Sequence, residues 1–389
     1  MSRVAVNKKV LRWAVRRRGL ELDELEQRFP RIRQWTTGER WTTGERQPTL
    51  RQLESLARAT FTPLGFFFLA EPPEERLPIP HFRTLHDETT AEPSPDLLET
   101  VQIMQRRQAW MHEFLIEQGQ RELPFVRSAR RDEQPRSVVQ RMLDTLGIDE
   151  GWAAAERTWT DALHIMRQVI EDAGILVVVN GIIGNNTHRK LDPNEFRGFV
   201  LVDGYAPLVF VNGADGKAAQ MFTLAHELAH VFYGSSAAFD LREMQPADDP
   251  MEKTCNRVAA EFLISQRELR QIWPSVRDDS EPFQKIARRF KVSALVAARR
   301  ALDTNLINRE AFLNFYRAYQ SDERRAAERR SEGGDFYANQ NLRVGQRFAS
   351  TVIRAVKEGK LLYSEAYRLT GLYGRTFEHY AASLGFGGA

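Results

Sequence analysis

Two histidines and a glutamate lie close together in the middle of the chain, at His226, Glu227 and His230. On a helix, residues four apart share one face, so the two imidazoles can bind the same metal ion. Glu227 follows the first histidine and can reach a water molecule on that metal without ligating it. This H-E-x-x-H pattern predicts two ligands of a zinc ion and a general base for hydrolysis.

A catalytic zinc ion needs a third protein ligand and one open position for water. Cysteine is an implausible source, because Cys255 is the only one in the chain. We predict that Glu252, at the start of a helical run, is the third ligand. The alternatives are Glu261, which falls near the same helical face, and the acidic residues Asp240, Glu243, Asp248 and Asp249.

Asn256 lies one turn after Glu252 on the same predicted face. Its side-chain oxygen can accept a hydrogen bond from the free ring nitrogen of a ligating histidine and so orient the ring. Zinc would lower the pKa of a bound water, and Glu227 would take the water proton and pass it to the leaving amine. The ligand set also suits Mn²⁺ or Fe²⁺. Tyr233 is expected to pack rather than to act in catalysis.

The alternative interpretation of the two histidines is a pair of hydrogen-bonded core residues without a metal. The helix predicted over residues 217–233 is apolar nearly all round, which indicates a buried helix. Two imidazoles and a carboxylate in such a helix need compensation for the loss of water. A bound dication supplies that compensation, so we favour the metal site.

After residue 160 the sequence begins to predict β-strands as well as helices. A helix is predicted over 163–172, followed by short strands at 174–179, 199–202 and 208–211. The last two are separated by five residues, which is typical of an antiparallel hairpin. Two more helices are predicted at 251–264 and 266–273. A strand-bearing region within a helical chain predicts an α+β protein that is mostly α.

Bulk composition narrows the class of protein. The chain has 389 residues, of which 42% are hydrophobic and 28% charged, as is ordinary for globular proteins. A single cysteine excludes an internal disulfide framework and fits a reducing cytosol. Neither a signal peptide nor an apolar run long enough to span a membrane is apparent. We therefore expect a cytoplasmic protein with no membrane partner.

The first 60 residues hold twice as many Lys and Arg as Asp and Glu. This excess of positive charge is equally consistent with binding to nucleic acid or an acidic partner and with an ordinary solvated surface.

Four parts are predicted: residues 1–72 form a small helical domain, 73–155 a linker with connecting helices, 156–320 the domain with the H-E-x-x-H helix, and 321–389 a charged connector with a helical C-terminal module. The hexapeptide at 35–40 is repeated at 41–46, for which we find no physical reason.

The run from Phe222 to His230, with Glu252, Asn256 and the apolar residues that follow, resembles the ImmA/IrrE metallo-endopeptidase family over residues 160–275. The resemblance implies a zincin-like, thermolysin-type site with His226, His230 and Glu252 as ligands and Glu227 as catalytic acid/base. It also implies protein substrates such as repressors or antitoxins that control mobile elements or stress genes.

Residues 8–69 resemble the Cro/CI (XRE) type of helix-turn-helix. The interval after Leu25 is shorter than that pattern requires, and Pro30 lies where the turn or recognition helix should start. Arg28, Arg31 and Arg33 could still contact DNA phosphates. The alternative is a docking domain for a protein partner. The resemblance is carried by Leu11 to Gly19, Leu25, Trp41, Gly44, Gln47 to Leu50 and Leu53 to Ala57.

Two later segments carry weaker signals. Residues 283–302 have helix-turn-helix spacing with Ser293 as a cap, and we expect them to be packed into the metal-site domain rather than to read DNA. Residues 335–389 resemble tails found on longer members of the same family. His379 is expected to be an ordinary surface residue.

The leading hypothesis is a zinc endopeptidase that cleaves a regulatory protein such as a repressor or antitoxin, with the basic first domain recruiting it to DNA or to its target. The alternative is a DNA-binding regulator or antitoxin whose peptidase domain serves mainly to bind a partner. A third hypothesis is a metal-stabilised interaction protein without turnover. Glu227 favours the first, because a structural zinc site has no need of it. The oligomeric state is not predicted.

Overall fold

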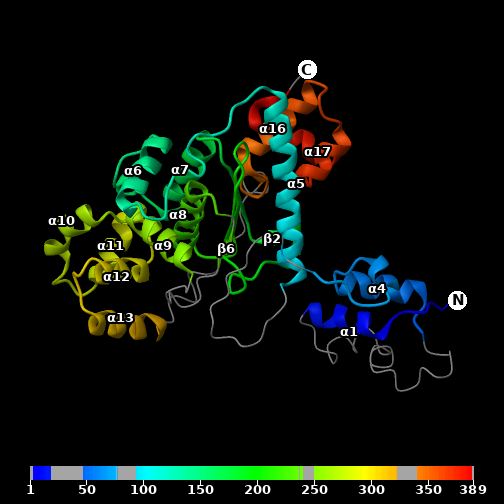
Figure 1. Cartoon of the computed structure of the whole chain (residues 1–389), viewed down its shortest axis with the longest axis horizontal. Helices are drawn as coiled ribbons and strands as arrows, with labels where there is room; N and C mark the ends of the chain where they lie inside the picture. Colours follow the sequence, from blue (N-terminus) through cyan, green and yellow to red (C-terminus); the bar gives the residue numbers. More distant parts are fainter. Residues whose placement is uncertain are drawn as a thin grey trace. The chain divides into compact units, whose positions relative to one another are not determined.

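The computed structural model describes residues 3–18, 47–75, 77, 93–235, 237–239, 249–321 and 340–387 (Figure 1). The chain divides into two compact units. The first comprises Met1–Pro78 and Asp87–Val101, and the second comprises Ile79–His86 and Gln102–Ala389. Each unit is described by itself below. Arg28, Arg31 and Arg33 lie outside the described residues.

The first unit is helical where it is described. It contains α1 (Lys8–Arg17), α4 (Leu50–Ala59), the 3-10 helix η2 (Leu64–Phe68) and the first turns of α5 (Pro95–Glu117). Thr49 begins α4 with a capping box, in which its side chain accepts from the N–H of Gln52 and the Gln52 side chain accepts from the N–H of Thr49. The helical prediction for this region is confirmed over these residues.

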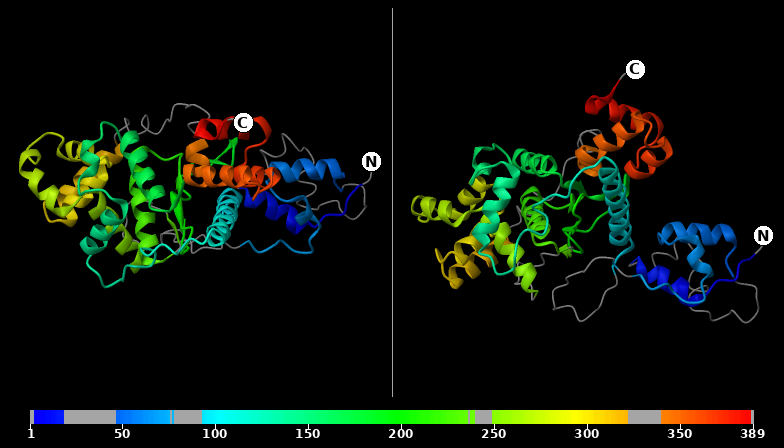
Figure 2. Two further views of the ribbon diagram at one scale, coloured as in Figure 1. Left: turned by 90° about the horizontal axis from the view of Figure 1, so that it is seen from above. Right: turned by 45° about the horizontal axis from the view of Figure 1, so that its top comes forward.

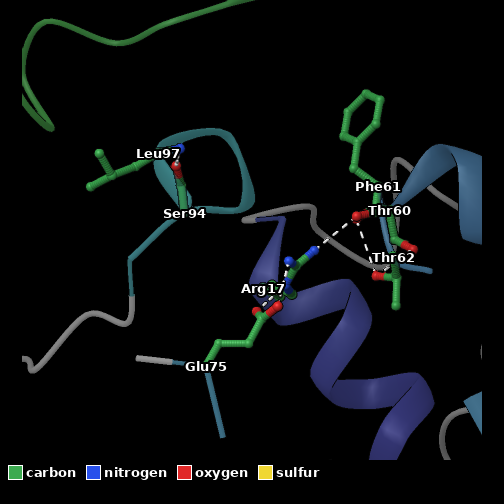
Figure 3. A network of polar contacts seen from close by, with 7 residues as sticks. All are labelled: Arg17, Thr60, Phe61, Thr62, Glu75, Ser94 and Leu97. Carbon is green, nitrogen blue, oxygen red and sulfur yellow. Dashed lines mark hydrogen bonds and ion pairs between the residues drawn. The ribbon is translucent and has the colours of Figure 1, made fainter. Parts of the chain in front are cut away.

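A polar network ties the elements of the first unit together (Figure 3). Arg17, near the end of α1, donates to the carbonyl oxygen of Phe61 at 2.9 Å and forms an ion pair with Glu75, in which Nη2 lies 2.7 Å from Oε1. Ser94 caps α5 by accepting from the N–H of Leu97 at 3.1 Å. The buried face of α1, which includes Val10 and Leu11, packs in a small apolar core with residues of α4 and η2.

The second unit contains a four-stranded sheet in the order β1-β5-β4-β6. Its strands are β1 (Leu176–Asn180), β4 (Gly198–Leu201), β5 (Leu208–Asn212) and β6 (Ala237–Phe239). β4 and β5 are antiparallel, which confirms the predicted hairpin, whereas β1 runs parallel to β5. The small pair β2 (Ile182–Ile183) and β3 (Asn186–Lys190) and the edge strand β6 were not predicted.

Helices cover both sides of this sheet (Figures 1 and 2). On one side lie α7 (Trp159–Asp172) and α8 (Lys217–Tyr233), and on the other lie α5 and α16 (Gln346–Lys357). The bounds of α8 are those predicted for the H-E-x-x-H helix. The helix is therefore held between the sheet and a further helical layer.

That outer layer packs against the far side of α8. Its first members are α6 (Pro135–Leu146) and α9 (Pro250–Leu263), which contact each other and α8 or α7. The others are the short 3-10 helix η3 (Trp152–Ala155), α10 (Gln266–Val276), α11 (Pro282–Phe290), α12 (Ala294–Asp303) and α13 (Arg309–Ser321). As expected, the α11–α12 segment belongs to the core of this unit, and Ser293 caps α12 by accepting from the N–H of Val296 at 3.1 Å.

The C-terminal module comprises η4 (Asn341–Gly345), α16, α17 (Tyr363–Thr370), α18 (Gly374–Ala381) and η5 (Ala382–Phe386). Arg107 of α5 is buried and donates to the carbonyl oxygens of Leu369 and Arg343, both at 2.9 Å. Gly345 has a φ of +86°, and a Cβ there would lie 2.8 Å from the carbonyl oxygen of Val177 in β1. The module is thus fastened to the sheet by close backbone contact.

The predicted fold class is confirmed: the described chain is α+β and mostly α, with a small mixed sheet. Within the described residues, no helix has the length and apolar character needed to cross a membrane.

Candidate metal centre

The helix that carries His226 and His230 is buried along most of its length. Every residue of α8 from Gln220 to Phe232 is buried, so no side of this part of the helix faces solvent. Gly234 ends the helix at a φ of +76°, a conformation that glycine adopts without strain. Polar side chains in this helix have lost water on all sides.

Helix α9 brings Glu252 to the same place. Asp249 caps α9, and its carboxylate accepts from the N–H groups of Met251 at 2.6 Å and Glu252 at 3.2 Å. Pro250 occupies the first turn, where a missing N–H costs nothing. Glu252 therefore sits in the first turn of α9, which packs directly against α8.

Three side chains converge between these helices. Nε2 of His226 lies 3.1 Å from Oε2 of Glu252, and Nε2 of His230 lies 3.1 Å from Oε1. The two Nε2 atoms are 3.0 Å apart. All three residues are buried, and one ligand atom from each lies within 4.8 Å of the others. The sequence prediction placed these three residues together, and the structure does so.

Asn256 determines which ring nitrogen of His226 faces the cluster. Nδ1 of His226 donates to Oδ1 of Asn256 at 3.0 Å, so a neutral His226 directs the lone pair of Nε2 toward Glu252. The carboxylate also presents lone pairs there. Such an arrangement of acceptors is unfavourable by itself and favourable around a cation, so the residues fit a metal ion.

The protonation of these groups also suits a cation. Burial lowers the pKa of His226, which keeps its imidazole neutral and able to ligate. Burial alone would raise the pKa of Glu252, but the adjacent His226 and His230 hold it well below its usual value. The cluster therefore offers two imidazoles and one carboxylate, the donor set that zinc takes in hydrolytic sites.

Glu227 lies beside the cluster but forms no part of it. Both of its carboxylate oxygens are buried and have no hydrogen-bond partner among the described residues. Burial, and then the charge of Glu252, raise its pKa well above the usual value. A buried carboxylate without a hydrogen-bond partner destabilises the folded state, so its presence here points to a chemical role rather than a structural one.

Gly198, the first residue of the inner strand β4, makes room for Glu227. A Cβ on Gly198 would lie 2.5 Å from Cγ2 of Thr223 and 3.4 Å from Oε1 of Glu227, so β4 approaches α8 more closely than another residue would permit. Sequence reasoning missed this residue. The signal was a glycine at the head of a strand, which often marks a close approach.

Of the other residues considered as ligands, Glu261 and Asp249 lie outside the cluster. Glu261 forms a buried ion pair with Arg300 and accepts from the N–H of Gln266 at 3.3 Å, so it is not part of the cluster. Asp249 is a helix cap. Asp240, Glu243 and Asp248 lie outside the described residues. Tyr233 is half-buried and packs against the core, and burial raises its pKa to about 12.

Comparison with known families agrees with this geometry. Residues 170–302 match the IrrE N-terminal-like domain of the M78 peptidases, and residues 344–383 match a domain of unknown function. No curated protein matches the chain. The region that holds the His226, His230 and Glu252 cluster is thus a metallopeptidase domain. Neither matched segment includes residues 8–69, where the sequence resembles a helix-turn-helix.

Proposed function

Because residues 170–302 carry a metallopeptidase domain, we propose that the protein is a zinc-dependent endopeptidase in which His226, His230 and Glu252 hold the metal and Glu227 is the general base. The observation that carries this proposal is the buried carboxylate of Glu227, which has no hydrogen-bond partner in the described part of the chain and lies next to a three-residue donor cluster. A site that only stabilised the fold would have no use for that carboxylate.

The chain's own residues would act in a fixed order. When bound, zinc supplies polarisation of the scissile carbonyl and a lowered pKa of its water. Glu227 accepts a proton as water attacks the carbonyl carbon, and it then donates that proton to the leaving amine. The raised pKa suits the second step, since a carboxylate that is too acidic would hold the proton too weakly to deliver it.

Asn256 acts through His226 rather than on the substrate. Its Oδ1 accepts from Nδ1 and so fixes both the tautomer and the orientation of the ring. His230 has no such partner for its own Nδ1 among the described residues. We therefore assign Asn256 a positioning role in metal binding.

We propose a regulatory protein, such as a repressor or antitoxin, as the substrate, on the basis of the family resemblance. The proposed organisation has a basic helix-turn-helix-like domain at 1–72, connecting helices at 73–155, the peptidase domain at 156–320 and a C-terminal module at 321–389. The first domain would recruit the enzyme to DNA or to its target. Its basic composition supports this role.

The test is cleavage of the proteins encoded beside its gene by the wild type and by Glu227→Gln, each loaded with zinc. We expect Glu227→Gln to lose activity by about 10²–10⁴-fold, because the general base is gone, while it retains its metal. Glu378→Gln, an exposed change on α18, serves as the matched control and should cleave normally. Equal activity of Glu227→Gln and wild type, or no cleavage by any zinc-loaded form, would overturn the proposal.

A further inference from the structure

A cavity of about 1110 Å³ opens next to the metal cluster, between α6, α9, α10 and α12. Pockets for small molecules usually measure about 300–1000 Å³, so this one has room for several residues of a peptide. It lies entirely within the second unit of the chain. Neither the metal cluster nor Glu227 lines it.

The charged lining of this cavity is predominantly basic. The two acidic residues in the lining, Glu261 and Asp303, are already bonded to arginines. Glu261 pairs with Arg300, and Oδ1 of Asp303 accepts from Nε of Arg299 at 3.0 Å. Over the described residues, no carboxylate of the lining is thus left to neutralise the remaining basic side chains.

Four basic residues of the lining have no ion pair with any described carboxylate: Arg136, Lys253, Arg257 and Arg270. They come from α6, α9 and α10, so their charges approach the cavity from several sides. Like charges gathered around one space repel one another and attract an anion. Three of the four are arginines, whose planar guanidinium groups pair with carboxylates through two parallel hydrogen bonds.

One helix end adds to this positive potential. α6 begins at Pro135 without a side-chain cap, and Pro135 lines the cavity. The N-terminal end of a helix carries partial positive charge, so α6 favours an anion at the same place as the unpaired basic side chains. The start of α10 adds less, because the N–H of Gln266 already donates to Glu261 and Ser265 caps the helix.

Asn256 connects the cavity to the metal cluster. The residue lines the cavity, and its Oδ1 accepts the hydrogen bond from Nδ1 of His226. Phe222, one turn before His226 on α8, and Val296 add apolar surface to the lining. An occupant would thus meet both basic and apolar groups while it contacts the residue that orients His226.

We propose that this cavity binds an acidic segment of the protein that the enzyme cleaves, with Arg136, Lys253, Arg257 and Arg270 pairing with its Asp and Glu side chains. The inference rests on the proposed peptidase function and adds a substrate class to it. The mixed basic and apolar lining fits a peptide better than a nucleic acid, since no exposed aromatic ring among the residues that the structure describes lines the cavity for a base to stack on.

Fluorescence anisotropy of a labelled poly-glutamate peptide tests the proposal, with the zinc-loaded Glu227→Gln variant as receptor so that nothing is cleaved. Poly-glutamate should bind more tightly than poly-glutamine. Arg257→Glu and Arg270→Glu should each weaken binding by about 10-fold or more, because each replaces an attractive charge with a repulsive one. Arg121→Glu, an exposed change outside the cavity, should have no effect.

Three outcomes would overturn the proposal. They are equal binding of the two peptides, binding that Arg257→Glu and Arg270→Glu leave unchanged, and displacement of the peptide by a single-stranded oligonucleotide at lower concentration than by free poly-glutamate. Because the assay requires no turnover, its result is independent of the cleavage test. Binding with no cleavage by the wild type would contradict the peptidase function alone.

Discussion

Glu227 and Glu252 are close neighbours whose environments shift their protonation in opposite directions. Burial raises the pKa of Glu227, whereas the two adjacent histidines outweigh burial and lower the pKa of Glu252. One carboxylate is thereby kept ready to exchange a proton and the other is kept ionised. Such a pair of separated pKa values is characteristic of sites in which two acids have different tasks.

The raised pKa of Glu227 predicts a pH-dependent gain in stability when the residue becomes glutamine. Above its usual pKa of 4.5 the unfolded chain releases a proton that the folded, metal-free chain retains, so the residue destabilises the fold increasingly as pH rises toward its folded pKa. In the presence of a chelator, Glu227→Gln should therefore raise Tm more at about pH 8 than at about pH 5. A gain of the same size at both pH values would contradict this account.

At the scale of elements, local pattern was enough to predict α8, α9 and the β4–β5 hairpin. Their apolar spacing, caps and turn length are encoded within a few consecutive residues. The helical spacing of α9 also led us to choose Glu252 as the third metal ligand and Asn256, one turn later, as the residue that orients a histidine. The parallel pairing of β1 with β5, the added strand β6 and the approach of β4 to α8 depend on contacts between distant residues, so no local pattern indicated them.

The close approach of β4 to α8 predicts that Gly198→Ala is destabilising. The new methyl group would lie 2.5 Å from Cγ2 of Thr223 and 2.8 Å from the carbonyl oxygen of Phe210. We expect urea denaturation to give a free energy of unfolding lower by about 1–3 kcal/mol. Adding Thr223→Ser, which removes the nearest atom, should restore part of the loss. Unchanged stability of the single variant would show that the two elements are not held at this distance.

At the scale of the whole molecule, the C-terminal module contributes to the sheet-bearing unit although it lies far away in sequence. The N–H of Arg347 donates to Oε1 of Glu171 at 3.1 Å, and the residues around Gly345 contact β1. Burial raises the pKa of Glu171 to about 7. A helical module could be predicted from the sequence, but its place against β1 could not, since that place depends on one glycine with a positive φ and on buried polar contacts.

Ending the chain before Gln340 should therefore destabilise what remains. Loss of the module would uncover the edge of β1, whose five residues are all buried, and an exposed apolar edge strand promotes association. We expect a lower Tm and larger species in size-exclusion chromatography. Gly345→Val, which keeps the full length, should shift Tm in the same direction, because a side chain there would meet the carbonyl oxygen of Val177. A shortened chain that is monodisperse with an unchanged Tm would contradict the docking of the module.

The central claim is that His226, His230 and Glu252 hold one metal ion, and metal analysis of Glu252→Gln tests it most directly. Glu261→Gln is the matched control, because Glu261 lies on the same helix but pairs with Arg300. The account predicts that zinc is lost from Glu252→Gln and retained by folded Glu261→Gln. Retention of stoichiometric zinc by Glu252→Gln, or its loss from Glu261→Gln alone, would contradict the assignment.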